Sequence, residues 1–215
     1  MPSTSPLRAL GREVVGLLLA AVCAGCATPG TLLCDRCRDA LTPAPRTVRT
    51  PGGLAVRAAL PYEGPAAACI RALKDRGETM LARPLGAALS TVLAPAQDPS
   101  SWVVPVPTSR VAFRRRGYRV PELLARRAGA EVQRLLAVAR VTPDQRGMGA
   151  ADRAGNVRGA LRARRAVPGA RVVIVDDVVT TGATLDEAAR ALRVAGFEVI
   201  SAVALAATPR GRGSG

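Results

Sequence analysis

The residues best suited to chemistry stand together in the segment 172–184, VVIVDDVVTTGAT. Two acids, Asp176 and Asp177, follow four consecutive β-branched residues, and a segment rich in Thr and Gly comes after them. Adjacent carboxylates repel each other unless a cation or hydrogen-bond donors offset the repulsion, so a hard divalent cation and hydroxyl groups suit them. Neutral hydroxyl and amide donors suit phosphate instead. The segment therefore predicts two neighbouring subsites with different ligands.

The residues around the acids predict a strand, a turn and a helix. The run from Val172 to Val175 has no polar alternation, which is typical of a strand covered on both faces of a parallel sheet. Apolar residues recur with helical spacing between Leu185 and Ala195. The loop between the two elements contains Thr180, Thr181, Gly182, Ala183 and Thr184. Ligands collect at the carboxyl ends of strands in open α/β sheets, and unpaired N–H groups at a helix start bind anions.

Other folds with similar segments fit less well. In a receiver domain the paired acids come early, with several β/α units after them, whereas only 38 residues follow Asp177. A Walker-type ATPase needs a G-K-[ST] sequence, and the sole lysine, Lys74, follows Leu73. A Rossmann-like strand whose acids merely cap a helix remains as the plainer alternative. The chain contains no His, so catalysis would depend on carboxylates, Arg, backbone dipoles or a metal.

Four cysteines form a second pattern, C-x-x-C, seven residues, then C-x-x-C. Its members are Cys23, Cys26, Cys34 and Cys37. Two such pairs can present four thiolates tetrahedrally, as in a structural zinc site, so we predict bound Zn²⁺. Disulfides are the alternative, and they would require an oxidising compartment. Cys69 stands apart in an apolar run and is expected to be a small core residue.

The amino-terminal residues imitate a secretory or lipoprotein signal. Arg8 and Arg12 precede the apolar run VVGLLLAAVCAGC, but Glu13 interrupts the boundary. Cleavage before Cys26 would discard Cys23 and leave three unpaired thiols. The apolar residues between Leu7 and Leu18 instead fit one face of a short helix, and no apolar segment reaches the length of about 20 residues needed to cross a bilayer. We therefore expect a cytoplasmic protein without membrane insertion.

The rest of the chain predicts one α/β domain attached to the cysteine module. We expect an amino-terminal helix and zinc module over 1–42, a linker over 43–53, the main domain over 54–208 and a flexible tail over 209–215. Within the main domain we expect a strand over 54–62, helices over 64–74, 78–93 with a kink at Pro84, and 121–136, and a strand over 102–104. Residues 113–118, FRRRGY, are expected to form a cationic loop. Residues 142–159 are rich in Gly and polar residues, which is typical of a segment that folds over a ligand.

Basic residues far outnumber acids, with a formal net charge of +15. Between Arg110 and Arg171 there are sixteen Arg and four acids, a local excess of +12. Such a block fits phosphate on a small molecule or on a nucleic acid backbone. The alternative is a genome that favours Arg codons and fills solvated helix faces with Arg. Few aromatic residues are present, which weakens the nucleic-acid interpretation because single-strand binders use aromatic stacking platforms.

The segment 172–184 resembles the phosphoribosyl pyrophosphate (PRPP) motif of type I phosphoribosyltransferases. The resemblance implies the fold of that family, a parallel sheet flanked by helices. It also implies that Thr180 to Thr184 bind the 5′-phosphate of PRPP, and that Asp176 and Asp177 bind the ribose hydroxyls, partly through Mg²⁺. In nucleotide-salvage relatives an acid that contacts the purine stands at the position of Thr180, so the resemblance does not extend to classical purine salvage.

Further segments are similar to those of the ComF family, phosphoribosyltransferase-like proteins linked to DNA uptake in competent bacteria. They are CAGC with CDRC, ALKDRG, VVPVPTSR with RRRGY, and R-x-x-N at Arg153 to Asn156. After RRRGY the family usually has Asn-Gln, where this chain has Arg119 and Val120. The resemblance implies a pyrophosphate loop formed by Pro105, Val106, Pro107, Thr108, Ser109 and Arg110, with Arg114, Arg115 and Arg116 beside it.

Two functional hypotheses follow from this resemblance. The first is a PRPP-binding protein that transfers phosphoribosyl to an unidentified acceptor, with Arg, Mg²⁺ and backbone N–H groups neutralising the pyrophosphate that leaves. The second keeps the fold without the chemistry. It is a non-catalytic zinc-containing adaptor whose Arg-rich face binds single-stranded DNA or a DNA-import helicase or recombination protein.

Overall fold

A five-stranded sheet forms the centre of the protein. The computed structural model describes residues 21–139 and 159–209. The strand order is β1 (Arg46–Arg49), β2 (Ala55–Pro61), β7 (Glu198–Ala207), β6 (Arg171–Val179) and β3 (Trp102–Pro105). Neighbours from β2 to β3 are parallel, and β1 joins β2 antiparallel at one edge. This arrangement confirms the predicted α/β fold with a mainly parallel sheet.

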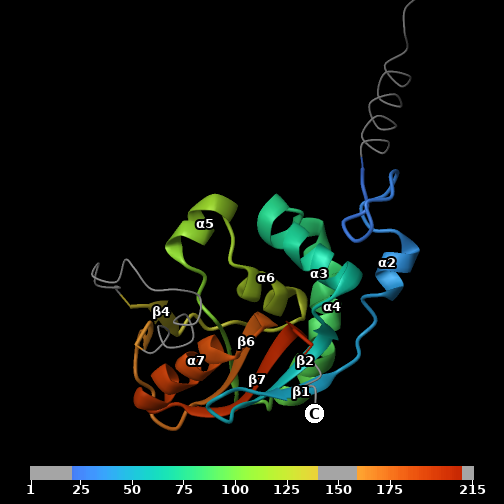
Figure 1. Ribbon diagram of the computed structural model, residues 1–215. Helices are drawn as coiled ribbons and strands as arrows, with labels where there is room; N and C mark the ends of the chain where they lie inside the picture. The colour runs from blue at the N-terminus through green and yellow to red at the C-terminus, as the bar shows by residue number, and fades with distance from the viewer. Residues whose placement is uncertain (1–20, 140–158, 210–215) are drawn as a thin grey trace, which may run out of the picture.

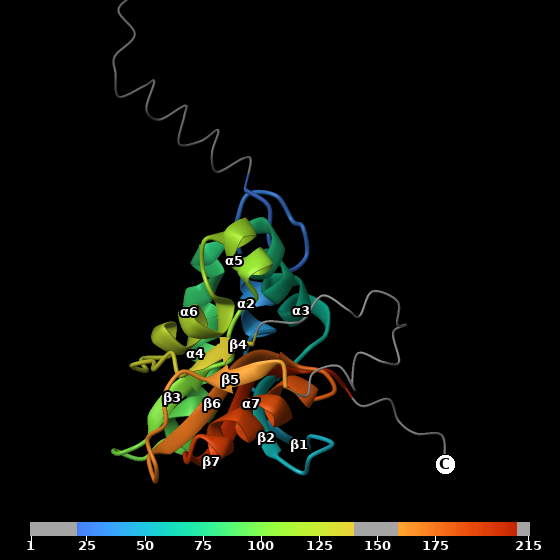
Figure 2. The same cartoon turned by 90° about the vertical axis from the view of Figure 1, so that its left-hand side faces the viewer.

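Helices cover both faces of this sheet (Figures 1 and 2). On one face, α4 (Ala82–Leu93) packs against β2 and β7, and α6 (Val120–Arg127) packs against β6 and β3. On the other face, α7 (Ala183–Val194) packs against β6 and β7. Each face has its own apolar core, so residues 172–177 of β6 are buried whichever way they point. That burial explains the unbroken apolar run at the start of β6.

Shorter elements surround this core. Near the amino terminus they are α2 (Asp35–Asp39), α3 (Gly64–Arg71), a π-helical turn over Ala72–Arg76 and a 3₁₀ turn over Thr79–Leu81. A second 3₁₀ turn spans Ala94–Ala96, and α5 (Arg110–Arg116) follows β3. A separate two-stranded antiparallel sheet consists of β4 (Leu136–Val138) and β5 (Leu161–Ala163). Within the described ranges no helix is long and apolar enough to cross a membrane.

Several expected elements have different bounds. The helix expected over 121–136 is wrong in its second half: α6 ends at Arg127, Gly129 has φ +88°, and Leu136 belongs to β4. The expected loop 113–118 is mostly helix, because the Ser109 side chain caps α5 by accepting from the Ala112 N–H at 3.2 Å. Strand β3 includes Pro105, one residue beyond the expected end. Pro84 lies in the first turn of α4, where proline is tolerated without a kink.

The segment expected as a linker over 43–53 contributes to the sheet. Residues 46–49 form β1, and a turn joins β1 to β2. In this turn the side chain of Thr50 donates to Asp186 in the first turn of α7, and the Gly52 N–H donates to the same carboxylate at 2.8 Å. The turn is thereby attached to the start of α7. The expected helix near residues 7–18 lies outside the described residues, as do nearly all of 142–159 and of the tail.

Candidate functional site

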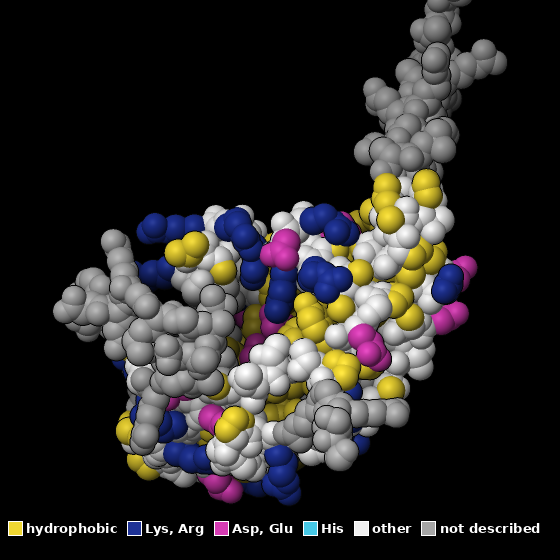
Figure 3. Space-filling view, viewed as in Figure 1, with side chains coloured by type: hydrophobic (Ala, Val, Ile, Leu, Met, Phe, Trp, Pro, Cys, Tyr) yellow, Lys and Arg dark blue, Asp and Glu magenta, His cyan; other side chains and the backbone are white. Residues whose placement is uncertain are grey.

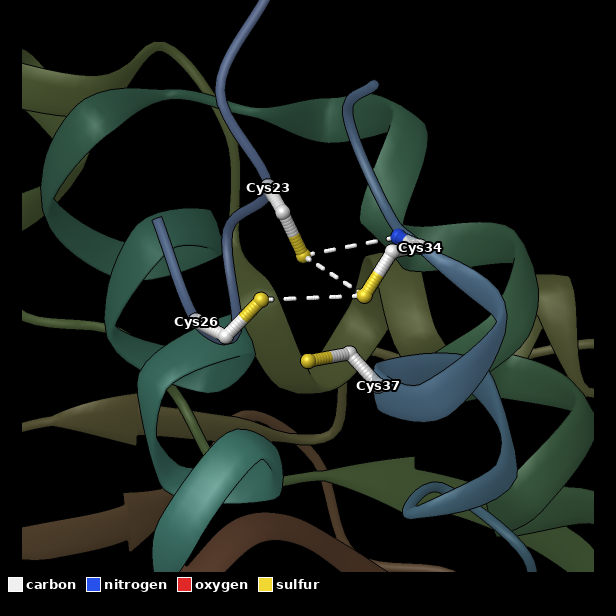
Figure 4. Close-up of side chains that lie close together, drawn as sticks. All are labelled: Cys23, Cys26, Cys34 and Cys37. Carbon is white, nitrogen blue, oxygen red and sulfur yellow. Dashed lines mark hydrogen bonds between the residues drawn. The ribbon is translucent and has the colours of Figure 1, made fainter. Parts of the chain in front are cut away.

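The four cysteines of the two C-x-x-C pairs converge on one point (Figure 4). Their sulfur atoms all lie within 4.8 Å of one another, and all four thiols are free of disulfides. Burial alone would raise the pKa of Cys23, but hydrogen bonds from the backbone at Cys34, Cys26 and Gly25 lower it to about 6. Burial and the neighbouring thiols raise the pKa of Cys37. Negative charge that builds up on four neighbouring sulfur atoms is unfavourable unless a cation offsets it. The cluster therefore fits a structural Zn²⁺.

The cysteine cluster packs directly on helix α3. Cys23 and Cys37 are buried in the same apolar core as Cys69, which is fully buried in α3 as predicted. A Cβ atom at Gly25 would lie 2.6 Å from the Cys37 sulfur and 3.2 Å from Pro65 at the start of α3. This close approach leaves no room for a side chain at Gly25 between the cluster and α3.

The acid pair lies inside strand β6, which continues to Val179. Asp176 and Asp177 are each only 9% exposed, and Asp176 accepts a hydrogen bond of 2.8 Å from the Asp177 N–H. Burial, followed by the charge of Asp177, raises the pKa of Asp176 to about 8. Buried oxygen donors with an unfavourable negative charge suit Mg²⁺ and ribose hydroxyls.

A residue that the sequence analysis did not place in the site, Lys74, contacts this pair. Its ammonium lies 2.8 Å from Oδ1 of Asp177, and the side chains are 23% and 13% exposed respectively. Lys74 comes from the π-helical turn, about a hundred positions away along the chain. The signal available in the sequence was that the only lysine of a chain rich in Arg stands in the ALKDRG segment.

The Thr- and Gly-rich segment forms the turn from β6 into α7, as predicted. Thr180 and Thr181 are exposed, and Ala183 and Thr184 begin α7. Gly182 has φ +86°, and a Cβ atom there would lie 2.5 Å from the Cγ2 atom of Thr50. The hydroxyl of Thr181 accepts from the Ala183 N–H at 3.4 Å. The turn presents hydroxyls and the amino end of a twelve-residue helix to solvent, which suits phosphate.

The residues predicted for a pyrophosphate loop divide into two groups. Most of the loop lines a cavity of about 390 Å³, while Ser109 caps α5. Arg115 and Arg116 instead contact Asp75 of the π-helical turn, at 2.9 and 3.8 Å. Arg114 is exposed on α5. The residues of the loop that line the cavity are Pro105, Val106, Pro107, Thr108 and Arg110.

Additional arginines, which the sequence analysis did not assign to a site, complete this cavity. They are Arg119, Arg134, Arg162 and Arg164. Among the described residues the only acid of the lining is Glu122, which accepts two hydrogen bonds from Arg134 at 2.8 and 2.6 Å. Those hydrogen bonds are the main reason why the pKa of Glu122 is lowered. One acid against five arginines leaves the cavity positive, so it suits an anion.

The two regions that suit anions meet at the carboxyl ends of neighbouring strands. In the parallel register Pro105 of β3 lies beside Val175 of β6, and the Val106 N–H donates to the Val175 carbonyl at 2.8 Å. The start of the loop after β3 is therefore adjacent to Asp176. Figure 3 shows a hollow in this face of the molecule below α5 and α3, with basic side chains along its upper rim.

Comparison with known proteins gives one family match, which lies in the carboxyl-terminal half, and one curated relative. Residues 111–214 match the phosphoribosyl transferase domain family, a range that includes the acid pair and the turn into α7. Competence protein F of Haemophilus influenzae is 34% identical over 112 residues, which cover 48% of this chain and 49% of that protein. The chain thus spans about half the length of this curated relative. These matches confirm the resemblance described from the sequence.

Solved structures with partial similarity to this chain were also found. Glutamine PRPP amidotransferase from B. subtilis is 25% identical, with a TM-score of 0.38 over 58% of this chain and 26% of that chain. Orotate phosphoribosyltransferase from Aeropyrum pernix is 22% identical, with a TM-score of 0.38 over 83% of this chain and 81% of that chain.

Proposed function

We propose that this ComF-like chain, which carries a phosphoribosyl transferase domain, binds PRPP together with Mg²⁺ at the carboxyl ends of β3 and β6. In this proposal residues 180–184 bind the 5′-phosphate, Asp176 and Asp177 bind the ribose hydroxyls, and the arginine-lined cavity receives the pyrophosphate. The observation that carries the proposal is the adjacency of three regions with the required chemistry, fixed by the pairing of Pro105 with Val175.

The residues present could support transfer of the phosphoribosyl group without His. The arginines of the cavity and the N–H groups of the loop after β3 would neutralise the pyrophosphate as it leaves. Bound Mg²⁺ would supply further neutralisation of that charge, and the buried acids offer the oxygen donors it prefers. Thr180 replaces the acid expected in purine salvage relatives, so we leave the acceptor unassigned and exclude classical purine salvage from the proposal.

Isothermal titration of the zinc-loaded protein with PRPP and Mg²⁺ tests this function. We expect saturable binding to the wild type and its loss in the double variant Asp176→Asn, Asp177→Asn. The control is Asp39→Asn, Glu63→Gln, which removes the same charge from two exposed positions outside the site and should bind like the wild type. Equal heats from the wild type and the acid-pair variant would exclude the proposed PRPP site.

A second function is supported by exposed arginines without an acidic partner in the described part of the chain. Arg110, Arg114 and Arg162 have this property. They would allow an adaptor role in which the protein binds single-stranded DNA or a DNA-import helicase or recombination protein. Fluorescence anisotropy with labelled single-stranded DNA should then show binding that weakens steeply with salt. The acid-pair variant should bind DNA as the wild type does, which separates this role from PRPP binding.

We also propose that the protein acts in the cytoplasm. The four cysteine thiols of the cluster are free, and thiolates that bind zinc persist in a reducing compartment. Fractionation of cells that express the full chain, with a cytoplasmic and a periplasmic marker, tests this location. Recovery with the periplasmic marker would contradict it.

A further inference from the structure

Lys74 supplies a positive charge at the acid pair from within the protein. Its ammonium lies 2.8 Å from Asp177, and neither side chain is more than 23% exposed. Two adjacent carboxylates in a strand are unfavourable when buried, because each loses hydration and repels the other. The lysine offsets part of that cost. Its positive charge therefore compensates the acids as a bound divalent cation would.

The backbone that carries Lys74 is fixed by several contacts. The turn Ala72–Arg76 is π-helical, an uncommon form that occurs frequently at functional sites. Ala72 and Leu73 are fully buried, and the Leu73 carbonyl accepts a hydrogen bond from the Tyr118 hydroxyl. Asp75 in the same turn contacts Arg115 and Arg116 of α5. The turn thus holds Lys74 at Asp177, while the next residue, Asp75, is attached to α5.

The chain contains many cations but places its only lysine here. An ammonium is a compact charge on a flexible stem, whereas a guanidinium forms planar, two-pronged contacts that are harder to exchange. Within the described residues no arginine is paired with Asp177, although arginines pair with acids at many other positions. Lysine therefore suits a position at which the cation must be displaced better than arginine does.

We propose that Lys74 is a resident counter-cation that competes with a divalent ion for Asp177. The inference rests on the proposed function only in taking the acid pair as the site of the divalent ion. Metal binding to the unliganded protein is then weak, because the ion must displace the ammonium. Lys74 is a positioning residue in this scheme: it holds Asp177 in place until the ion arrives, and its charge then becomes available to an anionic ligand.

The test is titration of the zinc-loaded protein with Mn²⁺ in the absence of PRPP, in which electron paramagnetic resonance measures the concentration of free Mn²⁺. Lys74→Gln should bind Mn²⁺ about tenfold more tightly than the wild type, because a competing charge in contact with the ligand has been removed. The double variant Lys74→Gln, Asp177→Asn should lose the gain. Lys74→Arg keeps the charge and should bind Mn²⁺ no more tightly than the wild type.

Arg76→Gln is the matched control, since it removes one positive charge from the same turn. Arg76 pairs with Glu78 at 2.6 Å rather than with the acid pair, so its removal should leave Mn²⁺ affinity near that of the wild type. Far-ultraviolet circular dichroism confirms that each variant is folded.

Unchanged or weaker Mn²⁺ binding by folded Lys74→Gln would overturn the inference, as would a gain of equal size in Arg76→Gln or the absence of Mn²⁺ binding from every variant. Failure of the proposed function is distinguishable. If the wild type does not bind PRPP while Lys74→Gln binds Mn²⁺ more tightly, the competition between Lys74 and the ion is supported and the proposed PRPP site is refuted.

Discussion

The cysteine cluster and the strand-end site differ in how their residues are brought together. The four cysteines lie within fifteen consecutive positions, from Cys23 to Cys37, and need only a tight local fold to meet. The strand-end site instead joins the π-helical turn, the loop after β3, strand β5 and the turn after β6. The first site is a property of one segment, whereas the second exists only when the whole sheet is formed.

This difference has consequences for stability and binding. Damage to the cluster removes a local cross-link and should be detected as lost zinc and lost stability. Damage to the strand-end site should alter ligand binding while zinc remains bound. Variants that change one region and spare the other therefore test whether the two are separable.

Cys37→Ser should have the largest effect. Cys37 is 1% exposed, and its loss would open the predicted zinc site and the packing on α3. We expect zinc content to fall from one ion per chain towards zero and the free energy of unfolding to fall by about 3 kcal/mol or more. Metal analysis and denaturant titration measure both. Cys69→Ala is the control, since it should cost about 1 kcal/mol and retain zinc. Full zinc occupancy in Cys37→Ser would refute the assignment.

Gly182→Ala should damage the other region. The alanine Cβ would strain a left-handed backbone and collide with Thr50, so we expect a loss of about 2–4 kcal/mol. PRPP affinity should fall while zinc content remains unchanged. Gly53→Ala introduces similar strain at φ +81° without a neighbour within 4 Å and should cost about 1 kcal/mol. If both variants lose equal stability in denaturant titrations, the contact with Thr50 does not contribute to the loss of stability.

Glu122→Gln should have an intermediate effect that depends on pH. Hydrogen bonds from Arg134 lower the pKa of Glu122 in the folded protein, so its contribution is fully present above the ordinary carboxyl pKa of about 4.3. At pH 7 we expect the variant to lose about 1–3 kcal/mol. The difference should shrink as pH falls through the lowered pKa, because the wild type then loses the same charge. Glu131→Gln changes an exposed acid and should show neither effect, and a difference independent of pH would contradict the argument.

Arg115→Ala should have the smallest effect on stability. Its ion pair with Asp75 joins side chains that are 63% and 54% exposed, and such pairs contribute less than about 1 kcal/mol. Thermal unfolding should be close to that of the wild type. PRPP titration of the same variant, compared with Arg36→Ala in α2, shows whether α5 contributes to the ligand site. A large loss of stability would mean that this contact supports the π-helical turn more strongly than its exposure implies.

The sequence allowed good prediction where chemistry and local structure coincide. The strand before Asp176, the turn at Gly182 and the cysteine cluster depend on short-range patterns, and the structure has all of them. Lys74 was missed because its role arises from a contact about a hundred positions away. Arg162 of β5 and Arg164 just after it were missed for the same reason, since the topology alone brings them to the loop after β3.

The wrong helix end has a local cause that apolar spacing concealed. The apolar residues after Arg127 continued the helical period, but Gly129 adopts positive φ and ends α6. Gly129 therefore predicts the end of α6 better than the apolar spacing does. In α5 the reverse happened: a run of positive charge suggested a loop, while the Ser109 cap and Gly117 at the end define a helix.

The turn between β1 and β2 has a consequence for any attempt to isolate the main domain. Thr50 and Gly52 donate hydrogen bonds to Asp186, and Thr50 also lies against Gly182. The stretch that seems dispensable in sequence therefore acts as a strap across the proposed phosphate-binding turn. A shortened protein starting at Leu54 would keep every residue of the proposed PRPP site and still lose that strap. Trimming should therefore begin before Arg46, so that the edge strand and its turn remain.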